Sequence, residues 1–186
     1  MQAQHLSIVG IVTIRRHKAG IIDIMRAQHA AGQHEAADRL MKRGEVVTRS
    51  RNIVVDSANC GIDLLRQWFV SGLTSVIAYP LGPQWGEIGT GTATPTTADV
   101  ALATPTARAT LSYAQNSGGV ASLQFFYSDA ILANGTYHEF GTFVGDPTMT
   151  ALGDGKMVNH VLFTSPYTKA SGNDTTAEVD FTIANL

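Results

Sequence analysis

The sequence predicts a mainly β protein with a β-sandwich-like domain, and two patterns carry this prediction. Apolar and polar residues alternate in several runs after Arg108, which indicates strands with one buried face. Clusters of Gly, Asn, Asp and Pro separate these runs at short intervals. Regular short strands joined by such turns are typical of a sandwich, so we expect two packed sheets.

The clearest of these strands are expected over residues 121–127, 158–163 and 177–183. Turn signals lie at 116–119, 134–135, 146–147, 153–155 and 171–174. Among them, Asn134-Gly135 is the strongest hairpin signal, because both residues tolerate the positive φ that a tight two-residue turn requires.

The N-terminal part, residues 1–56, reads as a strand hairpin with a helical tip. Residues 6–16 and 45–55 have extended patterns, and the segment of about 20–44 between them changes to a helical period. Gly32 interrupts that helical segment. We expect this hairpin to form an arm that reaches a neighbouring chain.

The remaining residues, 57–186, are expected to form the sandwich-like domain with a covering helix over 57–71. Asp56 and Ser57 are suitable N-cap residues, and Gly72 suits the end of the helix. Ile62, Leu65 and Phe69 form an apolar stripe that is better explained by burial against the sheet than by a partner groove.

Composition narrows the classes of function. Hydrophobic residues make up 44% of the 186 residues and charged residues only 15%, which suits a surface largely covered by neighbours. The net charge of −2 does not favour nucleic-acid binding, and the basic runs 15–18 and 49–51 are better read as charged strand edges. The lone Cys60 excludes a disulfide within the chain.

Targeting signals are not apparent in the sequence. The first residues lack the charged and apolar regions of a signal peptide, and no stretch approaches the roughly 18 apolar residues of a membrane-spanning helix. We therefore expect synthesis in the cytoplasm and no membrane span.

A glycine-rich segment over 86–99 admits two interpretations. Its backbone N–H groups could cradle a phosphate, but the lysine and spacing of a P-loop are absent, and Pro95 removes one donor. We favour an architectural turn in which Gly89 and Gly91 permit close backbone approach and Pro95 restricts the chain. A short helix is expected over 97–102.

A metal site would need at least three converging ligands. His29, His34, Glu35 and Asp38 offer the only such cluster, but His29 and His34 lie on either side of Gly32, and an exposed polar helix face accounts for the same residues without metal. We expect neither a metal ion nor a cofactor.

The sequence also gives little support for catalysis. His138, Asp129 and Ser128 form a conceivable triad, yet no G-x-S-x-G motif accompanies them. Glu139, a possible acid in a hydrolase, has no clear carboxylate partner. His160 alternates with apolar neighbours and is better read as a hydrogen-bonded core residue. We expect the protein not to be an enzyme.

Apolar and aromatic side chains are the candidate interface residues. Trp85 and Tyr79 lie near Pro and Gly in a loop-rich region, where an aromatic ring either anchors a partner or covers the end of the domain. In the helical tip, the corresponding candidates are Ile21, Ile24, Met25 and Leu40. An exposed Trp85 would also suit stacking on a sugar ring.

Four segments resemble, in type and order, those of tailed-bacteriophage virion proteins. Residues 88–102, followed by Arg108, are similar to a recurrent IGTGT-x-x-P segment that ends in AD and AL. Residues 51–57, 138–143 and 159–172 are similar to further pieces of that family, so the resemblance covers most of the chain from about Arg51. The insertion at 80–85 and the helical tip depart from the family pattern.

This resemblance implies a non-enzymatic structural component of a phage virion, made in the bacterial cytoplasm. It would pack as a homo-oligomer, in a symmetric ring or trimer, with other proteins of the tail, baseplate, neck or fibre attachment. A receptor- or glycan-binding module of a tail fibre and a capsid decoration protein are the alternatives.

Overall fold

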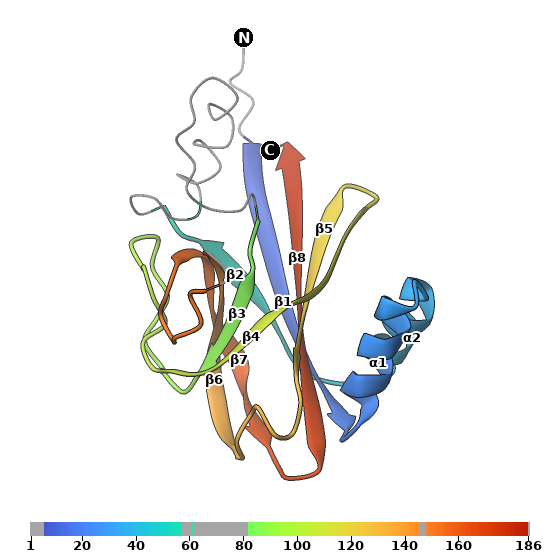
Figure 1. Ribbon diagram of the computed structural model, residues 1–186. Coiled ribbons are helices and arrows are strands. Elements are labelled where there is room, and N and C mark those ends of the chain that lie inside the picture. Colours follow the sequence, from blue (N-terminus) through green and yellow to red (C-terminus); the bar gives the residue numbers. More distant parts are fainter. Residues whose placement is uncertain (1–5, 57–60, 62–81, 146–147, 186) are drawn as a thin grey trace.

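The protein is an eight-stranded, closed, antiparallel β-barrel with two short helices on its outside (Figure 1). The computed structural model describes residues 6–56, 61, 82–145 and 148–185. The strand order around the barrel is β1-β2-β7-β6-β3-β4-β5-β8, and β8 pairs again with β1. The mainly β prediction is confirmed, but the sandwich is wrong, because pairing of β1 with both β2 and β8 closes the sheet on itself.

The strands vary widely in length. They are β1 (Leu6–Lys18), β2 (Glu45–Val54), β3 (Trp85–Gly89), β4 (Pro105–Ser117), β5 (Val120–Tyr127), β6 (Gly135–Val144), β7 (Lys156–Lys169) and β8 (Asn173–Asn185). β1 and β8 pair along their whole length, from Leu6 with Asn185 to Lys18 with Asn173. The N-terminal hairpin therefore forms part of the barrel wall, and only its helical tip lies outside.

The barrel interior is filled by side chains and forms the main core. Large aromatic rings dominate it, including Phe125, Tyr127, Phe140 and Tyr167, each at most 1% exposed. Val12 and Ile14 from β1 pack into the same cluster. Alternation along each strand places these residues inside and their neighbours outside, as expected for a small barrel.

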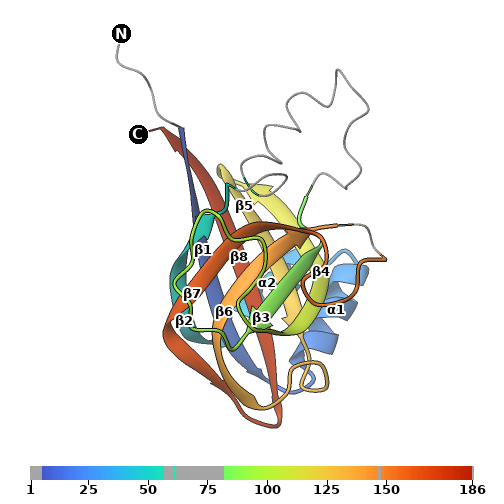
Figure 2. The same ribbon diagram turned by 90° about the vertical axis from the view of Figure 1, so that its left-hand side faces the viewer.

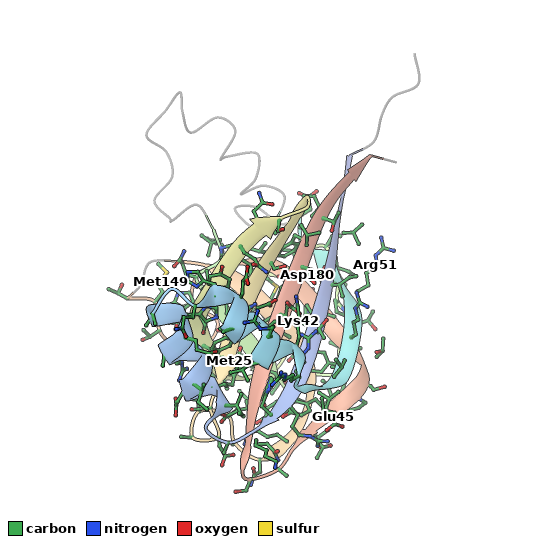
Figure 3. All side chains as sticks on the ribbon, turned by 90° about the vertical axis from the view of Figure 1, so that its right-hand side faces the viewer. Met25, Lys42, Glu45, Arg51, Met149 and Asp180 are labelled. Atoms are coloured by element: carbon green, nitrogen blue, oxygen red, sulfur yellow. The ribbon has the colours of Figure 1, made fainter. Side chains whose placement is uncertain are left out.

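The helical tip consists of α1 (Ile21–Ala30) and α2 (His34–Lys42), which confirms the expected helical segment with a break at Gly32. Both helices lie against the outside of the barrel near β5 and β8 (Figure 3). Their buried residues Ile22, Met25 and Met41 pack on Phe126, whose neighbours Phe125 and Tyr127 point into the barrel. The helices are thus held by a small second core.

The start of α1 depends on a residue distant in sequence. Its N-cap, Gly20, has a φ of 88° and makes no side-chain capping bond. Instead, the carboxylate of Asp174 in β8 accepts the backbone N–H of Ile22 at 3.0 Å. This contact satisfies one of the unpaired donors of the first turn.

Loops cover the outer face of β3, β6 and β7 and build a third apolar cluster. The connection between β3 and β4 crosses in front of β6 and β7 (Figure 2). Under the loops, Trp85 packs with Leu102, Phe143 and Met157. This side of the barrel is therefore shielded by loops, whereas the side at β5 is shielded by helices.

Two local expectations are wrong. Asn134-Gly135 does not form a hairpin, because β6 pairs with β3 and β7, and β5 pairs with β4 and β8. Residues 97–102 form no helix; Thr96 and Asp99 instead close a turn. The turn signals at 116–119 and 153–155 do join neighbouring strands, β4 with β5 and β6 with β7. The signal at 171–174 connects β7 to β8, which pair with other strands, and the signal at 146–147 lies outside the described residues.

Several expectations lie outside the described residues, namely most of the covering helix at 57–71 and the interface candidate Tyr79. Within the part of the chain that is described, neither helix has the length and apolar content needed to cross a membrane.

Adjacent residues of α1 test how the helices are attached. Replacing the fully buried Met25 with Ala should lower the free energy of unfolding by about 2–5 kcal/mol, because it leaves a cavity against the barrel. The control Ile24→Ala, at a side chain that is 48% exposed, should change it by no more than about 0.5 kcal/mol. Urea denaturation of both variants provides the measurement, and equal losses would contradict this packing.

Candidate functional site

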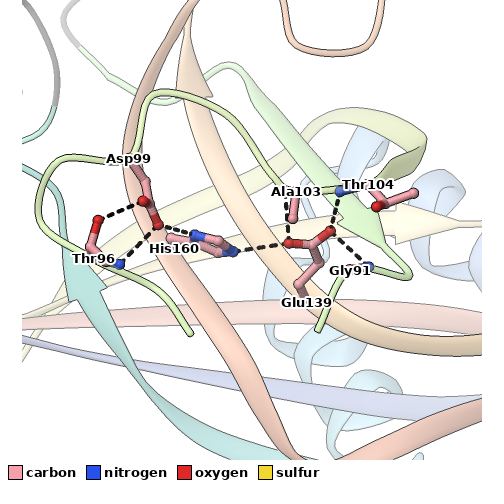
Figure 4. Close-up of polar contacts among 7 residues, drawn as sticks. All are labelled: Gly91, Thr96, Asp99, Ala103, Thr104, Glu139 and His160. Atoms are coloured by element: carbon pink, nitrogen blue, oxygen red, sulfur yellow. Dashed lines mark hydrogen bonds and ion pairs between the residues drawn. The ribbon is translucent and has the colours of Figure 1, made fainter. Parts of the chain in front are cut away.

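The buried carboxylate of Glu139 on β6 is the centre of a cluster of polar contacts (Figure 4). Its Oε1 accepts the backbone N–H groups of Gly91 at 3.0 Å and Thr104 at 2.7 Å. Its Oε2 accepts the N–H of Ala103 at 3.0 Å. One side chain of the barrel wall therefore binds both ends of the 90–104 loop.

His160 on β7 extends this cluster toward the middle of the loop. Its Nε2 lies 3.1 Å from Glu139 Oε2, and its Nδ1 lies 2.6 Å from Asp99 Oδ2 (Figure 4). Asp99 also accepts the backbone N–H and the hydroxyl of Thr96, at 2.9 and 2.6 Å. The imidazole thus bridges two carboxylates, and both of its nitrogens donate when it is protonated. We call Glu139, His160 and Asp99 the loop clamp.

Electrostatics favour the charged forms of the loop clamp. Burial alone would lower the pKa of His160, but its hydrogen bonds to Glu139 and Asp99 outweigh burial and raise the pKa. Burial would raise the pKa of Glu139, but bonds from His160 and the three backbone N–H groups outweigh it and lower the pKa. In Asp99, bonds from Thr96 and His160 likewise overcome burial and lower the pKa.

The two glycines of the glycine-rich segment are required by close approach to this carboxylate. A Cβ added to Gly91 would lie 2.4 Å from Glu139 Oε1. One added to Gly89 would lie 2.6 Å from the same oxygen and 2.5 Å from the backbone carbonyl oxygen of Thr104. Any side chain at either position would push the loop away from the acceptor. The architectural interpretation of Gly89 and Gly91 therefore has a specific physical cause, whereas Pro95 lies half-buried in the loop.

The glycine-rich segment does bind an anionic group, but this group is the Glu139 carboxylate of the same chain. The N–H group of Gly91, which a phosphate cradle would use, donates to Glu139 instead. Backbone N–H groups converge on a carboxylate for the same electrostatic reason that they converge on a phosphate.

A second buried cluster fixes the loop between β6 and β7. Arg108 on β4 pairs with Glu87 on β3 at 2.7 Å, and both side chains are nearly or fully buried. The guanidinium also donates to the backbone carbonyls of Ala151 and Asp154 at 2.6 and 2.9 Å. Its Cζ lies 4.7 Å from the centroid of the Trp85 ring. Arg108, like Glu139, therefore ties a loop to the barrel wall.

A third cluster lies at the opposite ends of the strands. The buried Lys169 ammonium pairs with Asp129 at 2.5 Å, and Asp129 also accepts the N–H of Gly172 at 2.9 Å. Hydrogen bonds from Lys169 and Gly172 lower the pKa of the Asp129 carboxyl. This cluster joins the segment after β5 to the β7–β8 turn.

The interface candidates occupy very different environments. Met25 is fully buried, and Trp85 is 7% exposed and packed inside the chain. Ile21 and Leu40 are partly buried against the helical core, whereas Ile24 is 48% exposed. Of the described candidates, Ile24 presents the largest accessible fraction to a neighbour.

Three of the side chains considered for catalysis, Asp129, Glu139 and His160, are engaged in structural contacts. Asp129 binds Lys169, and His160 is hydrogen-bonded and buried as expected, although between carboxylates rather than in the apolar core. All four hydrogen bonds to Glu139 come from groups that hold the loop. Within the described ranges, no three His, Cys, Asp or Glu side chains converge as a metal site.

The loop clamp is not apparent as a unit in the sequence. Asp99, Glu139 and His160 lie 61 positions apart at the extremes and belong to a loop and two strands. Neither helical nor strand periodicity relates such positions. The one available signal was that all three occur in segments carrying the phage resemblance.

Comparison of the chain with protein-family models, with curated proteins and with solved structures gives no match.

The close approach at Gly91 provides a direct test of the loop clamp. Gly91→Ala should lower the free energy of unfolding by about 1–3 kcal/mol, because its Cβ overlaps the Glu139 carboxylate. The control Gly82→Ala has open space around the new Cβ and should change stability by no more than about 0.5 kcal/mol. Thermal or urea denaturation distinguishes the two, and a neutral Gly91→Ala would contradict the geometry.

The loop clamp should also make stability depend on pH in both directions. The raised pKa of His160 means that its contribution is full below the ordinary value of 6.5 and is lost as pH rises through the folded value. The lowered pKa values of Glu139 and Asp99 mean that their contributions are full above 4.5 and 3.8 and are lost as pH falls through the folded values.

The variant His160→Gln isolates the alkaline side of this dependence. Its loss of unfolding free energy relative to the parent should be largest below pH 6.5 and should shrink as the pH rises through the raised folded pKa of His160, where the parent loses its own imidazolium. Urea denaturation of both proteins across this range makes the comparison, with all other titrating groups held in common. A difference that is constant with pH would argue against a charged His160.

Proposed function

We propose that this protein is a non-enzymatic structural component of a bacteriophage virion, located in the tail, baseplate or neck. One observation carries the proposal. Residues from the segments that resemble phage virion proteins, including Gly91, Asp99, Glu139 and His160, meet in the loop clamp. The resemblance therefore concentrates on residues that hold the architecture together.

Saturation of these polar groups supports a structural role over a catalytic one. A general base or nucleophile needs a lone pair or proton that a substrate can reach. Glu139 is 0% exposed and its oxygens accept four hydrogen bonds from the chain itself. Arg108 is similarly occupied by Glu87 and two loop carbonyls.

Assembly into a symmetric ring or trimer is the mode of action that we propose. Loops that are already ordered by contacts within the chain lose little conformational freedom on association. The entropic cost of binding a neighbour is therefore smaller. The low content of charged residues, 15%, fits surfaces that neighbours cover. Ile24 on α1 is the contact residue of the helical tip that the structure leaves accessible.

Immunogold labelling and immunoblotting of purified phage particles test the virion assignment. Gold at the neck, tail or tail tip would support it and locate the protein. Gold over the whole head would favour capsid decoration instead. A positive immunoblot without gold on intact particles would support a ring buried in the virion, and absence from both would refute the assignment.

The assembly mode can be tested on the purified chain. Light scattering coupled to size exclusion should give a single multiple of the 19.8 kDa chain mass. Ile24→Asp should shift the population toward monomer, because a charge would be buried in the contact, without loss of unfolding cooperativity. The matched control Asp23→Asn alters the neighbouring exposed residue and should leave the mass unchanged. A monomeric parent protein would refute self-assembly of the isolated chain.

A further inference from the structure

The two helices meet at a pair of histidines that the loop clamp and the proposed assembly do not use. His29 lies in the last turn of α1, and His34 is the first residue of α2. Their Nδ1 atoms are 3.1 Å apart. We propose that His29 and His34 form a binding site for one exchangeable divalent transition-metal ion, such as Zn²⁺ or Ni²⁺. Two protein ligands are fewer than a permanently occupied site needs, so water would fill the remaining coordination positions.

The distance between the two nitrogens fits shared coordination. An ion about 2.0–2.1 Å from each nitrogen would see them at an angle of about 100°. This value lies between the ideal angles of octahedral and tetrahedral coordination, so both geometries are accessible with small side-chain rotations. Without an ion, one Nδ1–H can donate to the other Nδ1, and the metal would replace this single proton bridge.

Tyr113 on β4 limits the motion of both imidazoles. Its ring stacks on His29 with a centroid distance of 4.2 Å and on His34 with one of 4.8 Å. The interplanar angles are 20° and 22°. The rings are thus held on a common platform, which reduces the conformational entropy lost on binding an ion.

The surroundings of His29 favour its neutral form, which is the form that offers a lone pair to a metal ion. Burial, followed by the proximity of His34, lowers the pKa of His29. Asp38, one turn beyond His34, opposes this shift and places a negative charge near a bound cation. Asp38 also pairs with Lys42 at 2.7 Å and accepts a weak bond from Gln124 at 3.5 Å.

A bound ion would link the end of α1 to the start of α2 across the connecting residues 31–33. This role does not require the virion assignment, so the two proposals fail independently. The proposed site lies in the helical tip, a segment that the resemblance to phage proteins does not cover.

Isothermal titration of the full-length chain with zinc chloride at neutral pH tests the site. We expect one ion per chain, with affinity reduced at least about tenfold in both His29→Gln and His34→Gln. The control His138→Gln removes a histidine on β6 outside the pair and should bind like the parent. Nickel chloride in place of zinc should give the same ranking of variants.

A second measurement separates direct coordination from a change in folding. Zinc should shift the side-chain ¹⁵N resonances of His29 and His34 and leave that of His138 in place. Absence of binding up to about 1 mM zinc would overturn the proposal. Equal affinity in the parent and both variants, or loss of binding in the control as well, would also overturn it.

Discussion

The binding of three backbone N–H groups by the Glu139 carboxylate is the interaction on which the loop side of the barrel depends. Gly91, Ala103 and Thr104 belong to a 15-residue loop without helix or strand, over residues 90–104. Such a segment has few backbone partners of its own, so an internal anion must supply them. Leu102 can then pack with Trp85 and Phe143. Apolar burial and polar anchoring therefore support each other.

Anchoring of backbone groups by a charged side chain recurs at other positions of the barrel. Glu139, Arg108 and Asp174 each project from a strand and satisfy backbone groups of a neighbouring loop or helix. Removing one partner of such a buried charge leaves the other unsatisfied, which costs more than the contact itself contributes. These clusters make the arrangement of the loops specific. Loops fixed in this way suit the assembly that we propose.

The differences between the expected and observed fold have a common origin. The pattern over 121–127 predicts a strand, and β5 is one, but alternation does not reveal its partners. Asn134-Gly135 suits a tight turn locally, yet the strand that follows pairs elsewhere. Residues 96–99 have the residue types of a helix N-terminus, yet the Asp99 carboxylate is hydrogen-bonded to His160. In the last two cases, long-range contacts override a local preference that is worth much less free energy.

The sequence by itself determined the mainly β class and the helical tip with its break at Gly32. These depend on periodicity and backbone freedom, which are local properties. Only the tertiary structure decided that the sheet closes into a barrel, that Trp85 is covered, and that Glu139, His160 and Asp99 meet. Closure and convergence depend on which strands pair across the chain, and no local pattern encodes that choice.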